Sequence, residues 1–146
     1  MLRPLVFLLG ISVSNAPLAH ASELQLRGIT SARLIATDGV FSMDGDVADL
    51  PSLASIAERE SAWLLVDDAH GFGVTDGGRG AAARLADAPP STTLLMVTFG
   101  KALASAGAAV LGPRLLIDFL VQRARTFVYD TAPPPACAAA ALAALD

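Results

Sequence analysis

Three short apolar segments, each followed directly by polar residues, constrain the fold of this chain more than any other feature. The segments are Arg33–Thr37, Ala62–Val66 and Leu94–Val97. They have the length of β-strands and show little polar alternation, which is typical of strands covered on both faces in a parallel sheet. Leu50–Arg59, between the first two, has the apolar spacing of a helix, with Pro51 in its first turn. This alternation predicts an α/β fold with a mostly parallel sheet and flanking helices.

The rest of the chain continues the alternation. We expect a short helix, a fourth strand, an amphipathic helix and an alanine-rich helix, over Ala81–Ala86, Ala108–Leu111, Arg114–Phe127 and Ala136–Leu145. The pair Pro89–Pro90 ends the first of these helices, and Pro133–Pro135 separates the last two.

Composition narrows the function classes. The chain has 146 residues, of which 53% are hydrophobic and 16% charged, so a buried core is expected and disorder is not. A formal net charge of −4 without a basic stripe argues against a nucleic-acid surface. With two histidines and no CxxC or HExxH pattern, the sequence predicts no metal site. The single cysteine, Cys137, fits a reducing compartment.

The first 30 residues form an apolar N-terminal segment with two interpretations. A basic start, the apolar run Leu5–Val13 and the small-x-small triplet Ala19–Ala21 resemble a secretion signal cleaved after Ala21. The run is too short to cross a membrane as a helix. We favour the second interpretation, in which residues 1–30 are the remnant of a truncated start and the protein is cytoplasmic. Residues 31–146 would then form the ordered unit.

Polar residues follow the predicted strands at Asp38–Asp46, Asp67–His70 and Thr98–Lys101. Because ligands of parallel α/β sheets bind at the carboxyl ends of the strands, we expect these three groups to share one site. The calcium-loop spacing D-x-D-x-D-G is absent, and neither a dinucleotide fingerprint nor a Walker loop is complete.

Lys101 is the only lysine, the other nine basic residues being arginine. An amine can form a Schiff base with an aldehyde, whereas a guanidinium stays protonated. A lysine, a carboxylate, an imidazole and hydroxyls together suit pyridoxal phosphate, whose ring accepts electrons while its nitrogen stays protonated. A Ser42–His70–Asp67 triad is the competing interpretation, but it lacks a nucleophile elbow.

Three motifs carry a family resemblance: Asp38–Asp46 with its Asp-Gly-Val-Phe-Ser-Met-Asp-Gly-Asp sequence, Val66–Gly71 with Val-Asp-Asp-Ala-His-Gly, and Thr98–Ala102 with Thr-Phe-Gly-Lys-Ala. Together they resemble the α-oxoamine synthases, pyridoxal-phosphate enzymes of the aspartate-aminotransferase fold. The resemblance runs from about Leu34 to the end. It implies that residues 31–146 are part of the large domain of a fold type I pyridoxal-phosphate transferase, without the small C-terminal domain.

The resemblance also implies residue roles around the cofactor ring. Lys101 would be the Schiff-base lysine and the base that removes the α-proton of the amino acid. Asp67 would pair with the pyridinium nitrogen, and His70 would bond the phenolic oxygen with Ser42 close by.

At the phosphate end, Thr98 would contact the phosphate of its own subunit, and Thr131 that of the neighbouring subunit in a homodimer. Asp130 stands where the family usually has a small hydroxyl residue, which places this intersubunit contact in doubt, because an acid beside a phosphate is unfavourable.

The implied reaction condenses L-alanine with pimeloyl-CoA or pimeloyl-acyl carrier protein in biotin biosynthesis, with loss of carbon dioxide and the free thiol. Family enzymes are more than twice this length, so we expect a middle portion with little or no turnover. Two alternatives stay open: another α-oxoamine synthase, of the 2-amino-3-ketobutyrate ligase or 5-aminolevulinate synthase type, or a non-catalytic remnant.

Overall fold

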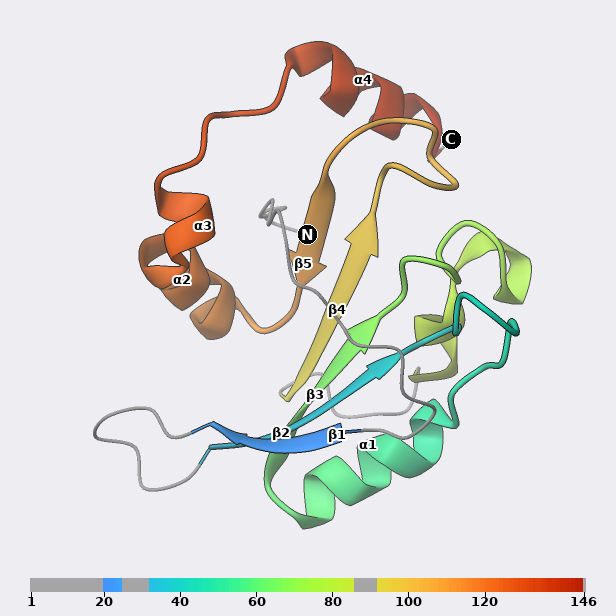
Figure 1. Ribbon diagram of the computed structural model, residues 1–146, viewed down its shortest axis with the longest axis vertical. Coiled ribbons are helices and arrows are strands. Elements are labelled where there is room, and N and C mark those ends of the chain that lie inside the picture. The colour runs from blue at the N-terminus through green and yellow to red at the C-terminus, as the bar shows by residue number, and fades with distance from the viewer. Residues whose placement is uncertain (1–19, 25–31, 86–91, 146) are drawn as a thin grey trace.

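Three parallel strands form the centre of the molecule. The computed structural model describes residues 20–24, 32–85 and 92–145. In it, β2 (Ala32–Asp38), β3 (Ala62–Asp67) and β4 (Thr93–Thr98) run side by side in the same direction (Figure 1). The register pairs Asp38 with Asp67, and Asp67 with Met96. The carboxyl ends of the three strands therefore lie at one edge of the sheet.

An antiparallel strand flanks this centre on each side. The strand β1 (His20–Leu24) pairs with β2, and β5 (Ala108–Leu111) pairs with β4, so the order is β1-β2-β3-β4-β5. The predicted α/β class with a mostly parallel sheet is confirmed. The strand β1 lies inside the segment read as a signal or remnant, and no alternation in the sequence predicted it. Residues 1–19 and 25–30 of that segment lie outside the described residues, as does Pro89–Pro90.

One face of the sheet packs against α1 (Leu50–Arg59) and the 3-10 turn η2 (Ala81–Leu85). Their core cluster combines strand and helix residues: Ile35, Val40, Leu50, Ala57, Ala62, Leu64, Val66 and Ala81. Alternate residues of β3 are buried here, as the period of two in a strand requires. The helix α1 begins at an Asp49 cap, whose carboxylate accepts hydrogen bonds from the Ser52 backbone at 3.3 Å and hydroxyl at 2.6 Å.

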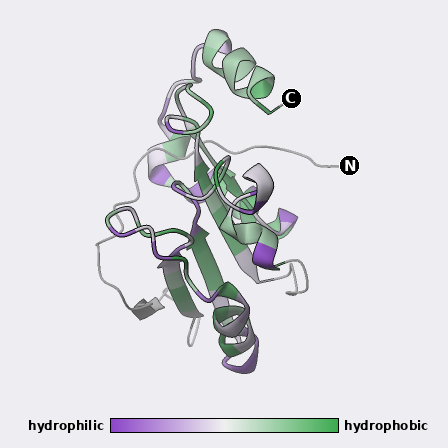
Figure 2. Cartoon of the chain, turned by 90° about the vertical axis from the view of Figure 1, so that its right-hand side faces the viewer, coloured by the Kyte–Doolittle hydropathy of each residue, from purple (hydrophilic) through white to green (hydrophobic). Residues whose placement is uncertain are grey.

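The helix α4 (Pro135–Ala143) lies beyond the carboxyl end of β4, next to the β4–β5 connection (Figure 1). Its Ala141 packs in a cluster with Val97, Phe99, Leu103 and Ala109. The Ser105 hydroxyl donates to the Cys137 carbonyl at 2.7 Å, which ties the β4–β5 connection to the helix. Figure 2 shows hydrophobic colour concentrated on the strands and on α4.

The opposite face of β4 and β5 is covered by α2 (Arg114–Arg123) and α3 (Arg125–Val128). Ile117 and Phe127 pack with Val110 there. The single helix expected over Arg114–Phe127 is therefore wrong: the backbone is extended at Ala124, with ψ at 103°. Both Ala124 and Phe127 still pack on this cluster, so the apolar spacing continues through a break that periodicity does not reveal.

A second 3-10 turn, η1 (Asp76–Gly78), precedes η2. No helix in the described ranges is long and apolar enough to cross a membrane.

Core packing predicts a large difference between two leucine truncations. Leu64 is fully buried in β3, whereas Leu115 on α2 is 85% exposed. Leu64→Ala should lower the free energy of unfolding by about 2–5 kcal/mol, because it removes buried methyl groups and leaves a cavity. Leu115→Ala should change it by less than about 0.5 kcal/mol. Urea denaturation followed by circular dichroism measures both, and equal effects of the two truncations would contradict this packing.

Candidate active site

Lys101 and His70 are in direct contact at the carboxyl edge of the sheet. Lys101 lies in the connection between β4 and β5, and His70 in the loop that follows β3. Lys101 Nζ is 2.7 Å from His70 Nε2, and both side chains are exposed. With Lys101 as an ammonium, Nζ donates and His70 Nε2 accepts, which places the ring proton of a neutral His70 on Nδ1. An amine and an imidazole 31 residues apart in sequence thus share one proton-transfer contact.

Two carboxylates lie beside this contact. Asp38 and Asp67 are paired neighbours at the ends of β2 and β3, on the sheet face away from α1. Asp67 Oδ1 accepts a hydrogen bond from the Ala69 backbone at 3.0 Å. Its Oδ2 has no hydrogen-bond partner within the described residues, so one oxygen of this half-buried carboxylate is available to a ligand.

The pKa of Asp38 is raised above its usual value. Burial is the largest cause and the charge of Asp67 is the second, while the charges of His70 and Lys101 act in the opposite direction. These four side chains are therefore close enough to act on one another electrostatically.

Backbone hydrogen bonds hold Lys101 at the tip of its turn. Phe99 donates to the Gly107 carbonyl at 2.8 Å, and Ser105 donates back to the Phe99 carbonyl at 2.9 Å. Ala104 donates to the Lys101 carbonyl at 3.0 Å and has a φ of +47°, a value that non-glycine residues rarely adopt. Phe99 itself is buried. The turn is thus anchored on both sides of an exposed amine.

Thr98 ends β4 next to this turn. Its hydroxyl donates to the Gly107 carbonyl at 3.3 Å and accepts from the Gly100 backbone at 3.4 Å. Both contacts are long, so a phosphate oxygen could replace the Gly107 carbonyl as the acceptor of this hydroxyl.

Two of the residues proposed from sequence make no side-chain hydrogen bond to the cluster within the described residues. Ser42 is exposed in the turn between β2 and α1, and within the described residues its side chain bonds none of Asp67, His70 or Lys101. The Ser42–His70–Asp67 triad therefore has no geometric support. Thr131 is exposed in the connection between α3 and α4, where its backbone donates to Asp130 Oδ1 at 2.9 Å.

Sequence reasoning placed Asp38 in a loop and assigned it no role at the site. The signal was available, because Asp38 and Asp67 each end an apolar strand. When two adjacent parallel strands end at the same level of the sheet, the residues that end them lie opposite each other. Asp38 and Asp67 are paired in this way.

The donor set is consistent with pyridoxal phosphate. A free carboxylate oxygen at Asp67, an imidazole at His70 and an amine at Lys101 lie at one edge of the sheet, which are the groups that a pyridine ring with an aldehyde and a phenolic oxygen requires. No group of three or more His, Cys, Asp or Glu in the described part of the chain could hold a metal ion.

The raised pKa of Asp38 predicts a pH dependence of stability. The folded state binds the Asp38 proton more tightly than the unfolded state, so this contribution to stability is complete below the unfolded pKa and is lost as pH rises through the folded value. The wild type should therefore lose some stability between about pH 4 and pH 7, and Asp38→Asn should lose less. The difference between the two losses should be below about 1 kcal/mol, because water screens these charges. Urea denaturation across this range tests it against Asp44→Asn in the exposed turn, and the prediction fails if the two variants have the same pH profile.

Comparisons with known proteins identify the family of this chain. Residues 17–146 match the family model of aminotransferase class I and II. The chain is 53% identical over 128 residues to the 8-amino-7-oxononanoate synthase of Chromobacterium violaceum, covering 88% of this chain and 33% of that enzyme. It is 49% identical over 146 residues to the corresponding synthase of Ralstonia pickettii, covering 94% and 35%. The chain spans about a third of the length of these curated relatives.

Solved structures show the same fold. The 8-amino-7-oxononanoate synthase of Francisella tularensis superposes with a TM-score of 0.63 at 36% identity, covering 75% of this chain and 32% of that one. The serine palmitoyltransferase of Sphingomonas wittichii gives 0.68 at 28% identity, covering 80% and 29%. One from S. paucimobilis, solved with a bound pyridoxal phosphate–myriocin aldimine, gives 0.70 at 25% identity, covering 80% and 30%. With its motifs, strand order and family match in agreement, the chain belongs to the aminotransferase class I and II family.

Proposed function

We propose that this chain provides part of the pyridoxal-phosphate site of an 8-amino-7-oxononanoate synthase. The observation that carries the proposal is the 2.7 Å contact between Lys101 and His70, beside the free oxygen of Asp67. Identities of about half the residues to synthases of that name support it. Residues 31–146 would form part of the large domain.

The contact gives the Lys101 ammonium group a nearby acceptor for its proton, His70 Nε2. A lysine becomes a nucleophile only when its ammonium group has lost a proton, and Nε2 of His70 is placed to accept that proton from Nζ. Lys101 would hold the cofactor's aldehyde group through Nζ, and as a free neutral amine Nζ would accept the α-proton of the amino acid. A protonated His70 would donate to the phenolic oxygen.

Asp67 would hold the ring nitrogen. Its carboxylate favours the protonated nitrogen, because opposite charges in contact stabilise each other. Pyridoxal phosphate bound in this way supplies an electron sink for the carbanion that proton removal creates. Asp38, next to Asp67, adds negative charge to the same position.

The remaining assignments concern phosphate binding and assembly. Thr98 would donate its hydroxyl to the phosphate in exchange for the Gly107 carbonyl. Thr131 would reach the phosphate of the neighbouring subunit in a homodimer. Ser42, exposed in the turn that follows β2, would lie close to the phenolic oxygen.

The proposed substrates are L-alanine and a pimeloyl thioester of CoA or acyl carrier protein, joined with loss of carbon dioxide and the free thiol. The names of the most similar curated relatives support this choice. The single cysteine and the biosynthetic reaction suit the cytoplasm.

Cofactor uptake tests the proposal without requiring turnover. Titration of the full chain with pyridoxal phosphate should produce a visible absorbance band that shifts on addition of L-alanine. The shift should be larger than with glycine or L-serine, since the proposed site accepts alanine. A larger shift with glycine or serine would assign the chain to a different α-oxoamine synthase.

Relocating the lysine provides a matched control. The double variant Lys101→Arg with Arg123→Lys keeps one lysine and nine arginines but moves the amine to the exposed end of α2. It should lose the visible band, because the amine is no longer beside His70. A band of equal intensity in this variant would contradict a specific role of Lys101.

A further inference from the structure

Asp68 is a buried carboxylate whose function the reaction itself does not explain. It follows Asp67 directly, yet its side chain is fully buried on the core side of the sheet. Its Oδ1 accepts a hydrogen bond from the Ala81 backbone at 3.2 Å, and its Oδ2 accepts one from the Ala82 backbone at 3.3 Å. A charged group at such a position is costly unless both of its oxygens are bonded, and here both are.

These bonds close a loop that contains His70. The backbone carbonyl of Asp68 accepts from Gly71 at 3.2 Å and from Phe72 at 2.9 Å, which holds the start of the loop. The Asp68 carboxylate holds its end, residues 81–82, at the beginning of η2. One residue therefore fixes both ends of the segment 69–80.

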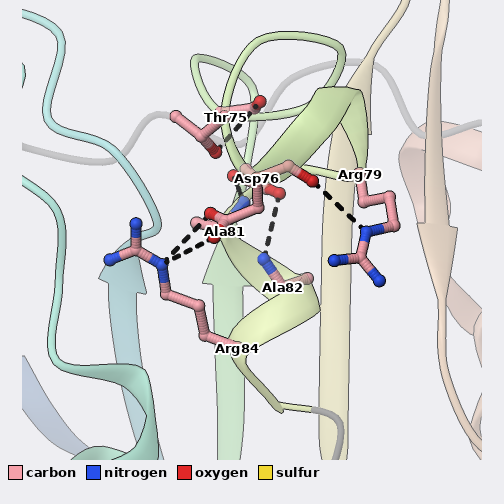
Figure 3. A network of polar contacts seen from close by, with 8 residues as sticks. Thr75, Asp76, Arg79, Ala81, Ala82 and Arg84 are labelled. Carbon is pink, nitrogen blue, oxygen red and sulfur yellow. Dashed lines mark hydrogen bonds and ion pairs between the residues drawn. The ribbon is translucent and has the colours of Figure 1, made fainter.

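The packing around the carboxylate is specific to its size. A Cβ atom added at Gly39, Gly71 or Gly80 would overlap the side-chain oxygens of Asp68. The loop is also supported at its far side, where Arg84 Nε pairs with Asp76 at 3.1 Å (Figure 3). This ion pair is partly exposed, so we expect it to contribute less than the buried bonds of Asp68.

The same loop presses against the turn that carries Lys101. Phe72 packs on the cluster formed by Val97, Phe99 and Leu103, which flank the lysine. Gly73 approaches Ala102, the neighbour of Lys101, so closely that a Cβ at Gly73 would lie 2.5 Å from the Ala102 Cβ. The position of the loop therefore sets where His70 meets Lys101.

We propose that Asp68 is a positioning residue, which holds the segment 69–80 closed so that His70 Nε2 stays within hydrogen-bond distance of Lys101 Nζ. This inference rests on the proposed function for its catalytic meaning. The effect of Asp68 on the distance between His70 and Lys101 can be measured without cofactor. Adjacent acids thus divide two tasks, Asp67 facing the ligand and Asp68 organising the loop behind it.

Two substitutions of Asp68 test the proposal. Asp68→Asn keeps the shape but turns one acceptor into a donor that faces a backbone N–H, and Asp68→Ala removes both acceptors. NMR of the full chain with labelled lysine and histidine gives one lysine spin system and two histidines. The wild type should show a nuclear Overhauser cross-peak between the Lys101 side chain and the His70 ring.

The cross-peak should weaken in Asp68→Asn and disappear in Asp68→Ala. Amide hydrogen exchange at Ala81 or Ala82 should accelerate about fivefold in Asp68→Asn, the factor expected for one lost hydrogen bond. Val66→Ala is the matched control, since Val66 is fully buried in β3, two residues before Asp68, but makes no hydrogen bond to the loop. It should lower stability while leaving the cross-peak intact.

Two results would overturn the inference. One is an unchanged cross-peak in both Asp68 variants, and the other is equal loss of the cross-peak in Val66→Ala. Failure of the proposed function is a separate result, because it would appear as absent cofactor uptake in a wild type whose cross-peak is present.

Discussion

The parallel register of β2, β3 and β4 is the constraint on which the site depends. It places the residues that end these strands at one edge of the sheet, so that Asp38, Asp67 and Thr98 lie on neighbouring strands. The antiparallel return of β5 then closes the connection over residues 99–107 as a hydrogen-bonded loop in which Lys101 is exposed. Asp38 and Lys101 are more than 60 residues apart in sequence, so they come together only because the strands that precede them are aligned.

Two adjacent carboxylates at the end of β3 have different surroundings. The two carboxylates of Asp67 and Asp68 face opposite sides of the sheet, because successive residues of an extended chain alternate. Asp67 retains an unbonded oxygen on the open side, whereas both oxygens of Asp68 are used by the backbone of η2. Burial raises the pKa of Asp68, with bonds from Ala82 and Ala81 opposing the rise. The carboxylate is therefore held in a costly position, which is consistent with a role in organising the loop.

Much of this arrangement was predictable from residue patterns. The limits of α1 and β5 match the expected ranges, because caps, prolines and apolar spacing act locally. The strand β1 was missed because its five residues contain neither an apolar run nor a clear alternation, and it forms by antiparallel pairing with β2, the next strand along the chain. The break at Ala124 was missed because the apolar spacing continues through it, with Ala124 and Phe127 both packed on Val110 and Ile117. From the sequence, His70 and Lys101 could be expected to lie near each other, but not to form a hydrogen bond. The proposed role of Asp68 could not be predicted, because it depends on hydrogen bonds from residues 13 and 14 positions later in the chain.

Borohydride reduction of the purified chain with pyridoxal phosphate, followed by peptide mass mapping, tests the central claim most directly. The chain offers one lysine and its N-terminal amine as acceptors of the label. If the strand ends assemble a cofactor site, the label should be found on Lys101 alone. Label distributed to the N-terminus, or no label, would contradict the claim that these residues form a working pyridoxal-phosphate site.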